Sequence, residues 1–411
     1  MVPNGWKKTF LSEVSDRVIV GLATSVTDYY VSAGVPIIRN QNIKKGYFDD
    51  TEMLYLTPEF SKKHPNKRVK AGDVITVHTG SNVGLTCVVP NEYDGAQTFT
   101  TLIVTPNKEL LESDFLNHLL NSKYGAYQAM RLVVGGGKGN LNTSDFKNYP
   151  ILLPPIHEQK NISQILATWD QAITVVSKLL ENSQQQKKAL VQELLVDKKR
   201  LIDGKGGGFC QKWEKKKLSQ LFNRVTVKNR GQSNNVVTIS AQQGLIRQED
   251  FFKKSVASEV LDDYFLLKKG QFAYNKSYSN GYPMGAIKRL NKYDDGVVTT
   301  LYICFEISNQ DESYSDFWEH YFESGLLNKG LSQIAHEGGR AHGLLNVKPS
   351  DFFSLKLDVP SYVEQQKIAS VLSDADREIE IFKQKLRFLK KEKNALMQQL
   401  LTGKKRVKVA A

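Results

Sequence analysis

Apolar residues recur every seven positions along two stretches of the chain, and this spacing predicts two long helices that each carry one hydrophobic seam. In the first stretch eight of ten seam positions are apolar, namely Ile162, Leu166, Trp169, Ile173, Val176, Leu180, Leu190 and Leu194. In the second stretch nine of ten are apolar, namely Ile368, Leu372, Ala375, Ile379, Phe382, Leu386, Leu389, Leu396 and Leu400. Prolines precede both stretches and suit the start of a helix. We therefore expect helices within 154–203 and 359–403.

The two seams share one register, 206 positions apart. The segment "PPIHEQKNISQILATWDQAI" begins at Pro154 and "PSYVEQQKIASVLSDADREI" begins at Pro360, and 16 of 46 aligned positions from 156 to 201 are identical. A stripe of roughly 33 residues is about 50 Å long, which exceeds the width of a domain of about 150 residues. This length favours an antiparallel intramolecular coiled coil. The alternative is that each helix packs on its own domain.

The repeat extends over the rest of the chain. The segment "WKKTFLSEV" at 6–14 matches "WEKKKLSQL" at 213–221, and "SDFLNHLLNS" at 113–122 matches "SDFWEHYFES" at 315–324. Such self-similarity indicates two copies of one structural unit. Antiparallel helices would then give the chain an approximate internal two-fold axis, with a globular domain at each end.

Each copy begins with about 150 residues of short β-rich runs, such as "GDVITVHTG", and one helical stretch near 113–131 or 315–335. This mixture predicts an α+β fold with two similar α/β domains. The boundaries that we expect are 1–153 for the first domain, 154–203 for a central helix, 204–358 for the second domain, 359–403 for a C-terminal helix and 404–411 for a basic tail.

Net charge, cysteine spacing and the lack of long apolar runs indicate the kind of partner, the absence of disulfide and zinc sites, and the location of the protein. The chain has 56 Lys and Arg residues against 43 Asp and Glu residues, a formal net charge of +13, which favours a polyanion such as nucleic acid. Its cysteines, Cys87, Cys210 and Cys304, lack disulfide-framework or zinc spacing. There is no signal-peptide pattern and no run of about 18 apolar residues. We expect a cytoplasmic protein without a membrane partner.

Polar loops in each domain are candidate readers of duplex DNA, whose successive half-sites lie about 34–36 Å apart on one face. Asn and Gln suit adenine, Arg and Lys suit guanine, and glycines allow close approach to phosphate. The candidates in the first domain are Arg39, Asn40, Gln41, Asn42, Thr79, Ser81, Asn82, Lys138, Asn140 and Asn142. Those in the second are Asn275, Lys276, Ser277, Tyr278, Ser279, Asn280, Arg340, His342 and Asn346. The alternative for any single residue is an ordinary polar turn.

These loops differ between the copies in length and chemistry, whereas the helices agree. If they read bases, the two half-sites should differ, and the target should be split and asymmetric. Catalytic motifs are missing from the sequence: there is no GxxxxGK[ST] loop and no strand–GxGxxG–helix unit. His118 and His320, at equivalent places in the repeat, fit packed histidines better than catalytic ones. We expect no catalytic residue and no metal site in this chain.

The duplicated "P-x-x-x-EQ-x-x-I-x-x-x-L" helices, the boxes "GWKKTFLSEV" and "KWEKKKLSQL", and "AGDVITVHTGSNVG" resemble the specificity subunits of type I restriction-modification systems. The resemblance covers the whole chain. It implies two target recognition domains that each read one half of a bipartite double-stranded DNA site, with the chain present as one copy. It also implies helices that dock two modification (methyltransferase) subunits, which use S-adenosylmethionine, and restriction subunits that use ATP and Mg.

The resemblance places subunit contacts on the helical segments, and the candidates there are Glu158, Gln159, Glu364 and Gln365. Helix capping is the alternative for these four residues. Two other classes of function stay open at this point. One is a coiled-coil adaptor without sequence-specific DNA binding, and the other is an enzyme with an unrecognised nuclease or methyltransferase activity.

Overall fold

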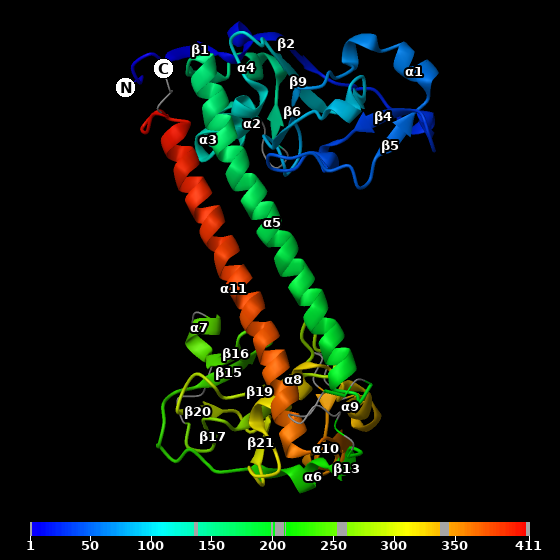
Figure 1. Ribbon diagram of the computed structural model, residues 1–411, viewed down its shortest axis with the longest axis vertical. Helices are drawn as coiled ribbons and strands as arrows, with labels where there is room; N and C mark the ends of the chain where they lie inside the picture. Colours follow the sequence, from blue (N-terminus) through cyan, green and yellow to red (C-terminus); the bar gives the residue numbers. More distant parts are fainter. Residues whose placement is uncertain are drawn as a thin grey trace. The chain divides into compact units, whose positions relative to one another are not determined.

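The computed structural model describes residues 2–134, 139–198, 200, 201, 209, 211–252, 261–337 and 345–407. The chain divides into two compact units (Figure 1). Unit 1 comprises Met1–Lys178 and Phe382–Ala411, and unit 2 comprises Leu179–Ile381. Each unit therefore includes one half of each long helix, whereas the predicted boundaries set the helices apart from the domains.

The two long helices are α5 (Ile156–Leu194) and α11 (Tyr362–Leu400), of 39 residues each. Every predicted seam position on both helices is buried or half-buried. In unit 1, Ile162 of α5 lies in one apolar cluster with Leu400 of α11, and in unit 2 Leu194 of α5 lies in one cluster with Ile368 of α11. The helices are thus antiparallel within each unit, which confirms the seam and the intramolecular pairing.

A four-stranded antiparallel sheet forms the centre of unit 1, in the order β2-β9-β6-β7. Its strands are β2 (Ser15–Val20), β9 (Thr101–Pro106), β6 (Val74–Val77) and β7 (Thr86–Val88). Two strand pairs accompany it, β1 (Lys7–Phe10) with β12 (Pro150–Leu153) and β10 (Val133–Val134) with β11 (Asn140–Leu141). The helices are α2 (Ser113–Asn121), α3 (Lys123–Leu132) and α4 (Thr143–Lys147).

Unit 2 repeats this scaffold, with a sheet in the order β14-β21-β18-β19. Its strands are β14 (Phe222–Val225), β21 (Ile303–Ile307), β18 (Phe272–Asn275) and β19 (Ala286–Arg289). The accompanying pairs are β13 (Glu214–Lys217) with β24 (Lys356–Val359) and β22 (His336–Glu337) with β23 (Leu345–Asn346). The helices are α6 (Leu218–Leu221), α8 (Ser315–Glu323), α9 (Asn328–Ile334) and α10 (Pro349–Ser354). The equal strand order confirms the internal repeat.

The units differ in what is inserted between the first and last strands of this scaffold. Unit 1 has helix α1 (Pro58–Lys62) and a second sheet in the order β3-β5-β4-β8, in which β4 and β8 are parallel. Its strands are β3 (Tyr30–Val31), β5 (Leu54–Leu56), β4 (Val35–Ile38) and β8 (Gln97–Thr98). Unit 2 has helix α7 (Gln248–Phe252) and the pairs β15 (Val237–Ser240) with β16 (Gly244–Arg247) and β17 (Phe265–Lys268) with β20 (Asp295–Val298).

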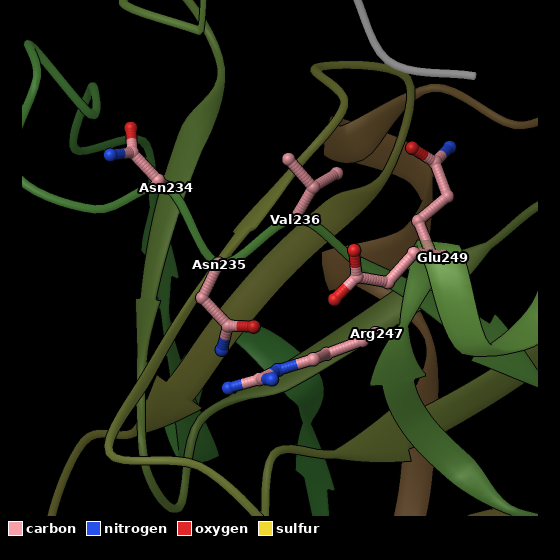
Figure 2. A pocket seen from close by; sticks show the side chains of 6 residues that line it. Asn234, Asn235, Val236, Arg247 and Glu249 are labelled. Atoms are coloured by element: carbon pink, nitrogen blue, oxygen red, sulfur yellow. The ribbon is translucent and has the colours of Figure 1, made fainter. Parts of the chain in front are cut away.

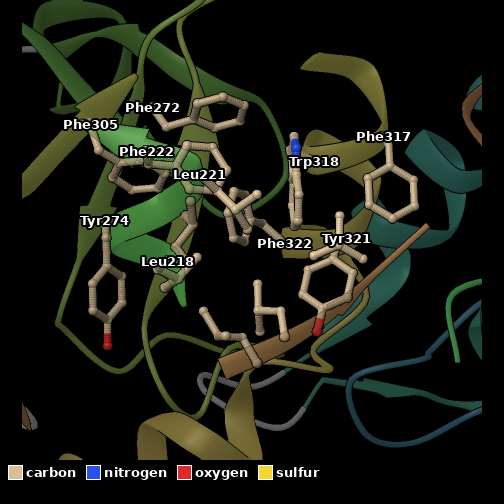
Figure 3. Packing of buried hydrophobic residues seen from close by; sticks show 14 of the residues in the cluster. Leu218, Leu221, Phe222, Phe272, Tyr274, Phe305, Phe317, Trp318, Tyr321 and Phe322 are labelled. Carbon is tan, nitrogen blue, oxygen red and sulfur yellow. The ribbon is translucent and has the colours of Figure 1, made fainter. Parts of the chain in front are cut away.

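The core of unit 2 is rich in aromatic residues (Figure 3). The same buried cluster includes seam residues of both long helices. The rings of Phe222 and Trp318 meet edge to face at 5.2 Å, and those of Phe272 and Phe305 stack at 5.4 Å. Burying one such side chain stabilises a fold by about 1.5–3 kcal/mol. Because the same cluster contains Ile368 and Leu372 of α11, the globular part and its helix segments share one core. Among the described residues, no helix has the length and apolar character needed to cross a membrane.

Candidate nucleic-acid interface

In unit 1 the loop after β6 joins the β10–β11 hairpin at one edge. The backbone N–H of Leu141 donates to His78 O at 2.9 Å, and Thr79 bridges to Asn140. The side chains of His78 and Asn140 are also hydrogen-bonded, at 3.0 Å, and the amide of Asn140 donates to Asn142 Oδ1 at 2.9 Å. Burial lowers the pKa of His78. The structure therefore brings three of the predicted readers, Thr79, Asn140 and Asn142, together.

Two further predicted residues of this edge are exposed at the tip of the β6–β7 turn. Ser81 and Asn82 follow Gly80, which has the left-handed φ of +92° that this turn requires. The amide of Gly80 donates to Gly139 O at 3.4 Å, so the turn is held against the hairpin. Lys138 lies outside the described residues.

In the predicted group Arg39–Asn42, three side chains make hydrogen bonds within their own loop region. Asn42 is 1% exposed, and its side chain closes the loop by donating to Asp49 O at 2.9 Å and accepting from Arg39 N at 3.0 Å. Arg39 donates to Glu52 O at 2.6 Å, and Gln41 donates to Glu52 Oε2 at 3.1 Å. Asn42 is therefore a structural residue of its loop, and its side chain is too deeply buried to contact a DNA base. Asn40 is half-buried, while Gln41 is exposed.

In unit 2 the equivalent edge carries the loop after β18. The N–H of Leu345 donates to Lys276 O at 3.0 Å, as Leu141 does to His78 in unit 1. Burial lowers the pKa of Lys276. Ser277 N donates to Asn275 Oδ1 at 3.1 Å and shapes the loop. The predicted residues Tyr278, Asn280 and Asn346 are exposed and Ser279 is half-buried, whereas Arg340 and His342 lie outside the described residues.

The same loop lines a cavity of about 340 Å³ that the sequence analysis missed. Besides Asn275 and residues 277–280, its wall includes Gln242 and Gln243 from the turn between β15 and β16. The signal was present in the sequence, since "AQQG" lies between the strand-like runs "VVTIS" and "LIR" and is a hairpin pattern. The turn lies far along the chain from the loop, so only the fold joins them.

A second cavity, of about 400 Å³, lies at the other end of the same hairpin and is lined by Asn234, Asn235 and Arg247 among others (Figure 2). Asn235 donates to Asp295 O at 2.6 Å. The guanidinium of Arg247 lies 5.4 Å from the ring centroid of Tyr293, a cation–π contact. This cavity is lined by none of the predicted loop residues. The edge formed by the loop after β18 and the β15–β16 turn is therefore the better candidate for reading bases.

The four candidates for subunit contacts are buried inside the chain. In unit 1 Glu158 is 2% exposed, and it accepts two hydrogen bonds from Arg406, both at 2.8 Å, and one from the Trp6 indole at 3.1 Å. Burial alone would raise the pKa of Glu158, but the bonds from Arg406 and Trp6 outweigh it and hold the pKa below its usual value. This arrangement is a clasp between the start of α5, the N-terminal segment and the C-terminal tail of unit 1.

Unit 2 has the same clasp, formed by Glu364, Arg200 and Trp213. Arg200 donates to both carboxylate oxygens of Glu364 at 2.7 and 2.8 Å, and the Trp213 indole donates at 3.2 Å. Here the balance differs, because burial, together with the nearby carboxylate of Asp197, raises the pKa of Glu364 in spite of Arg200. The two clasps match in geometry and differ in electrostatics.

Gln159 and Gln365 are fully buried beside these clasps. Gln159 accepts from Glu112 N and donates to the carbonyls of Leu110 and Pro154, at 2.8–2.9 Å. Gln365 makes the equivalent three bonds in unit 2. Glu158, Gln159, Glu364 and Gln365 therefore hold the fold together, and the expectation that they offer a surface to a partner is corrected. The prediction treated them as outward-facing because they lie off the seam, but the globular part covers that face.

The two histidines of the repeat are packed, as expected. His118 is 8% exposed, and burial, together with the charge of Lys393, lowers its pKa to about 4. His320 is hydrogen-bonded to Ser373 at 2.9 Å. Near them the two seam lysines form ion pairs across the helices, Lys393 with Asp170 in unit 1 and Lys187 with Asp376 in unit 2. In the described part of the chain no group of three or more His, Cys, Asp or Glu residues could hold a metal ion.

The first part of the chain matches a known protein family. Residues 3–182 match the family described as "Type I restriction modification DNA specificity domain". These residues thus carry a type I specificity domain, and the chain as a whole is similar to type I specificity subunits. Unit 2 repeats the strand order of unit 1, so the second half of the chain follows the same structural pattern.

Curated proteins similar to this chain match it over nearly its whole length. A Methanocaldococcus jannaschii protein named as the MjaX specificity subunit of a type I restriction enzyme is 24% identical and covers 99% of this chain and 95% of its own. The MjaVIII specificity subunit of the same organism is 23% identical over 92% of this chain and 91% of its own. The crystal structure of a type I restriction-modification S subunit from M. genitalium superposes with a TM-score of 0.56 at 16% identity, covering 100% of this chain and 99% of that one, and shows the same fold.

Proposed function

We propose that the chain is a type I specificity subunit and that each of its units reads one half of a bipartite, asymmetric DNA site. The observation that carries the proposal is the combination of a repeated scaffold with different inserted elements. The sheets β2-β9-β6-β7 and β14-β21-β18-β19 have the same order, but a mixed sheet is inserted in one and two antiparallel pairs in the other. Because the two scaffold sheets have the same strand order, they hold their loops in equivalent positions. Because the inserted elements differ, the side chains that they offer to DNA differ, and each unit would select different bases.

The net charge of +13 supports a duplex DNA ligand, because Lys and Arg contacts to phosphate supply affinity that does not depend on sequence. In this proposal the chain chooses the sequence and contributes no catalytic group. Methylation and cleavage then belong to the modification and restriction subunits, with their S-adenosylmethionine, ATP and Mg.

The helices offer a surface for two equivalent partners. Val175 of α5 is 51% exposed and Ile381 of α11 is 56% exposed, and these positions are equivalent in the repeat, 206 residues apart. Exposed apolar side chains at matching positions suit two copies of one partner. We propose them as docking positions for methyltransferase subunits, in place of the four buried residues.

The reading function is tested by mapping adenine methylation across the genome by long-read sequencing, in cells that express the partner subunits with and without this chain. A split, asymmetric motif that is methylated only with the chain supports the proposal. An unchanged pattern, with the partners expressed, contradicts it and favours the adaptor hypothesis.

The docking surface is tested separately by co-purification. Val175→Glu and Ile381→Glu should each reduce the number of methyltransferase subunits retained, because each places a charge at an apolar contact. Gln185→Glu, at an exposed polar position of α5, is the control. Full retention by both variants would remove these positions from the interface.

A further inference from the structure

The turn between β15 and β16 is fixed in register by its two strands. The strands pair from Val237 with Arg247 to Ser240 with Gly244, which leaves a three-residue turn, Ala241 to Gln243. Val237, Ile239 and Leu245 belong to a buried cluster, so the register is fixed by burial. Gly244 supplies the left-handed φ, +78°, with which the turn ends.

A partly exposed polar network, in which only Lys288 is buried, is bonded to the turn. The Tyr282 hydroxyl lies 3.0 Å from Ala241 O and 2.7 Å from Glu323 Oε2, and it accepts a hydrogen bond from Lys288 Nζ at 3.0 Å. Lys288 is only 9% exposed, and it also pairs with Glu323. The turn is therefore attached to the β18–β19 loop, to β19 and to α8, and its position follows that of the scaffold.

The side chains at the tip are free to bind. Gln242 and Gln243 are exposed, and neither side-chain amide has a hydrogen-bond partner in the part of the chain that the structure describes. One cavity beside them is also lined by Asn275 and Asn280 with Ser277 and Ser279, and no charged side chain lines it. The two glutamines also line a smaller cavity, of about 230 Å³, whose wall includes charged residues such as Lys288 and Arg289.

A side-chain amide offers one donor and one acceptor side by side, which is the pattern that adenine presents through N7 and N6–H in the major groove. Guanine presents two acceptors and suits Arg or Lys, and cytosine presents a donor and suits a carboxylate. The tip of this hairpin carries amides only. Because the hairpin is held by the scaffold, the backbone that carries these amides is placed in advance and needs no reordering on binding.

We propose that Gln242 and Gln243 are specificity-determining residues of unit 2 and read adenine in its half-site. This inference rests on the proposed function. It is confined to unit 2, because unit 1 carries the β3-β5-β4-β8 sheet between the corresponding strands and uses Asn42 to close its own loop.

The test uses the complete complex with its methyltransferase subunits. Long-read methylation mapping defines the motif, and competition binding then measures relative affinity for duplexes with each base at each position of both half-sites. The variants are Gln242→Ala, Gln243→Ala and Gln243→Glu. Gln232→Ala, at another exposed glutamine of unit 2, is the matched control.

We expect Gln242→Ala or Gln243→Ala to reduce discrimination at an adenine position of one half-site by about 5- to 150-fold, with the other half-site and the control unchanged. Gln243→Glu keeps the shape of the side chain at an exposed position, so folding is preserved. It should shift the preference at that position from adenine towards cytosine, whose amino group donates to a carboxylate.

Unchanged base preference in all three variants, with methylation still dependent on the chain, would overturn this inference and leave the proposed function standing. A change confined to guanine positions, or one spread equally over both half-sites, would also overturn it. If the unaltered chain directs no sequence-specific methylation, the proposed function fails and this inference fails with it.

Discussion

Replacing Arg406 by alanine should loosen unit 1 and leave unit 2 intact. The substitution removes two charge-assisted hydrogen bonds from Glu158, a carboxylate that is 2% exposed. In the part of the chain that the structure describes, the Trp6 indole then remains as a side-chain donor to this carboxylate. A buried carboxylate that loses its cation is strongly destabilising, because the charge was taken out of water at a large cost.

The magnitude follows from the exposure of the two partners. Breaking a fully buried ion pair costs about 3–5 kcal/mol. The side chain of Arg406 is 42% exposed, so water reaches the carboxylate after the substitution, and Trp6 still donates. We therefore expect a loss of about 2–3 kcal/mol in the local stability of unit 1. This loss corresponds to an equilibrium constant for local opening that is about 30- to 150-fold larger.

Hydrogen exchange read by mass spectrometry measures this loss for each unit in the intact chain. Peptides from the start of α5, residues 156–166, should exchange faster in Arg406→Ala, while peptides from the start of α11, residues 362–372, should not. Arg200→Ala should give the reverse, because Arg200 pairs with Glu364 in unit 2. Lys405→Ala is the control, since Lys405 is an exposed neighbour in the tail.

Two results would refute this reasoning. One is faster exchange in both units after a single substitution, which would mean that the clasps do not act within their own units. The other is an equal effect of Lys405→Ala, which would mean that the charge of the tail matters and the bond to Glu158 does not.

Four other substitutions and one double variant test the packing of the helices, each by pulse-labelled urea unfolding that follows the peptides of each unit. The pKa of His118 in the folded chain is about 4, below its ordinary value of 6.5. The free energy of unfolding of unit 1 should therefore be highest above pH 6.5 and should fall as the pH drops from 6.5 towards 4. His118→Gln should reduce this dependence on pH. Gln159→Leu should destabilise unit 1, and Gln365→Leu unit 2, by about 2–3 kcal/mol, because each leaves one buried and two partly buried backbone groups without this partner; an unchanged midpoint would disprove it. Lys393→Leu should lower the free energy of unfolding of unit 1 by about 1 kcal/mol, because it leaves Asp170 unpaired. The double variant Lys393→Leu with Asp170→Leu should recover this stability. If the two losses add instead, the ion pair is not the cause.

The sequence by itself determined the helices, their seams and the repeat. A hydrophobic seam is visible as apolar residues spaced seven positions apart, and a repeat is visible as similarity between two parts of the sequence. Both patterns can be recognised without knowing which distant segments are in contact in the fold. The packed state of His118 followed in the same way, from its apolar neighbours on a short helix. The loop positions of Thr79, Asn140 and Asn280 also followed from the sequence, because polar residues beside glycine indicate turns, while their role in reading bases stays a prediction.

Only the tertiary structure decided which polar residues face outward. Glu158 lies off the seam, and the sequence suggests a surface position, yet Arg406 from 248 residues away covers it. Asn42 looked like a reader and instead closes its own loop. Gln242 became a candidate only when the fold placed its hairpin beside Asn280. The reason is physical: apolar periodicity is local in the chain, whereas the burial of a polar side chain depends on donors and covering segments that the chain supplies from far away.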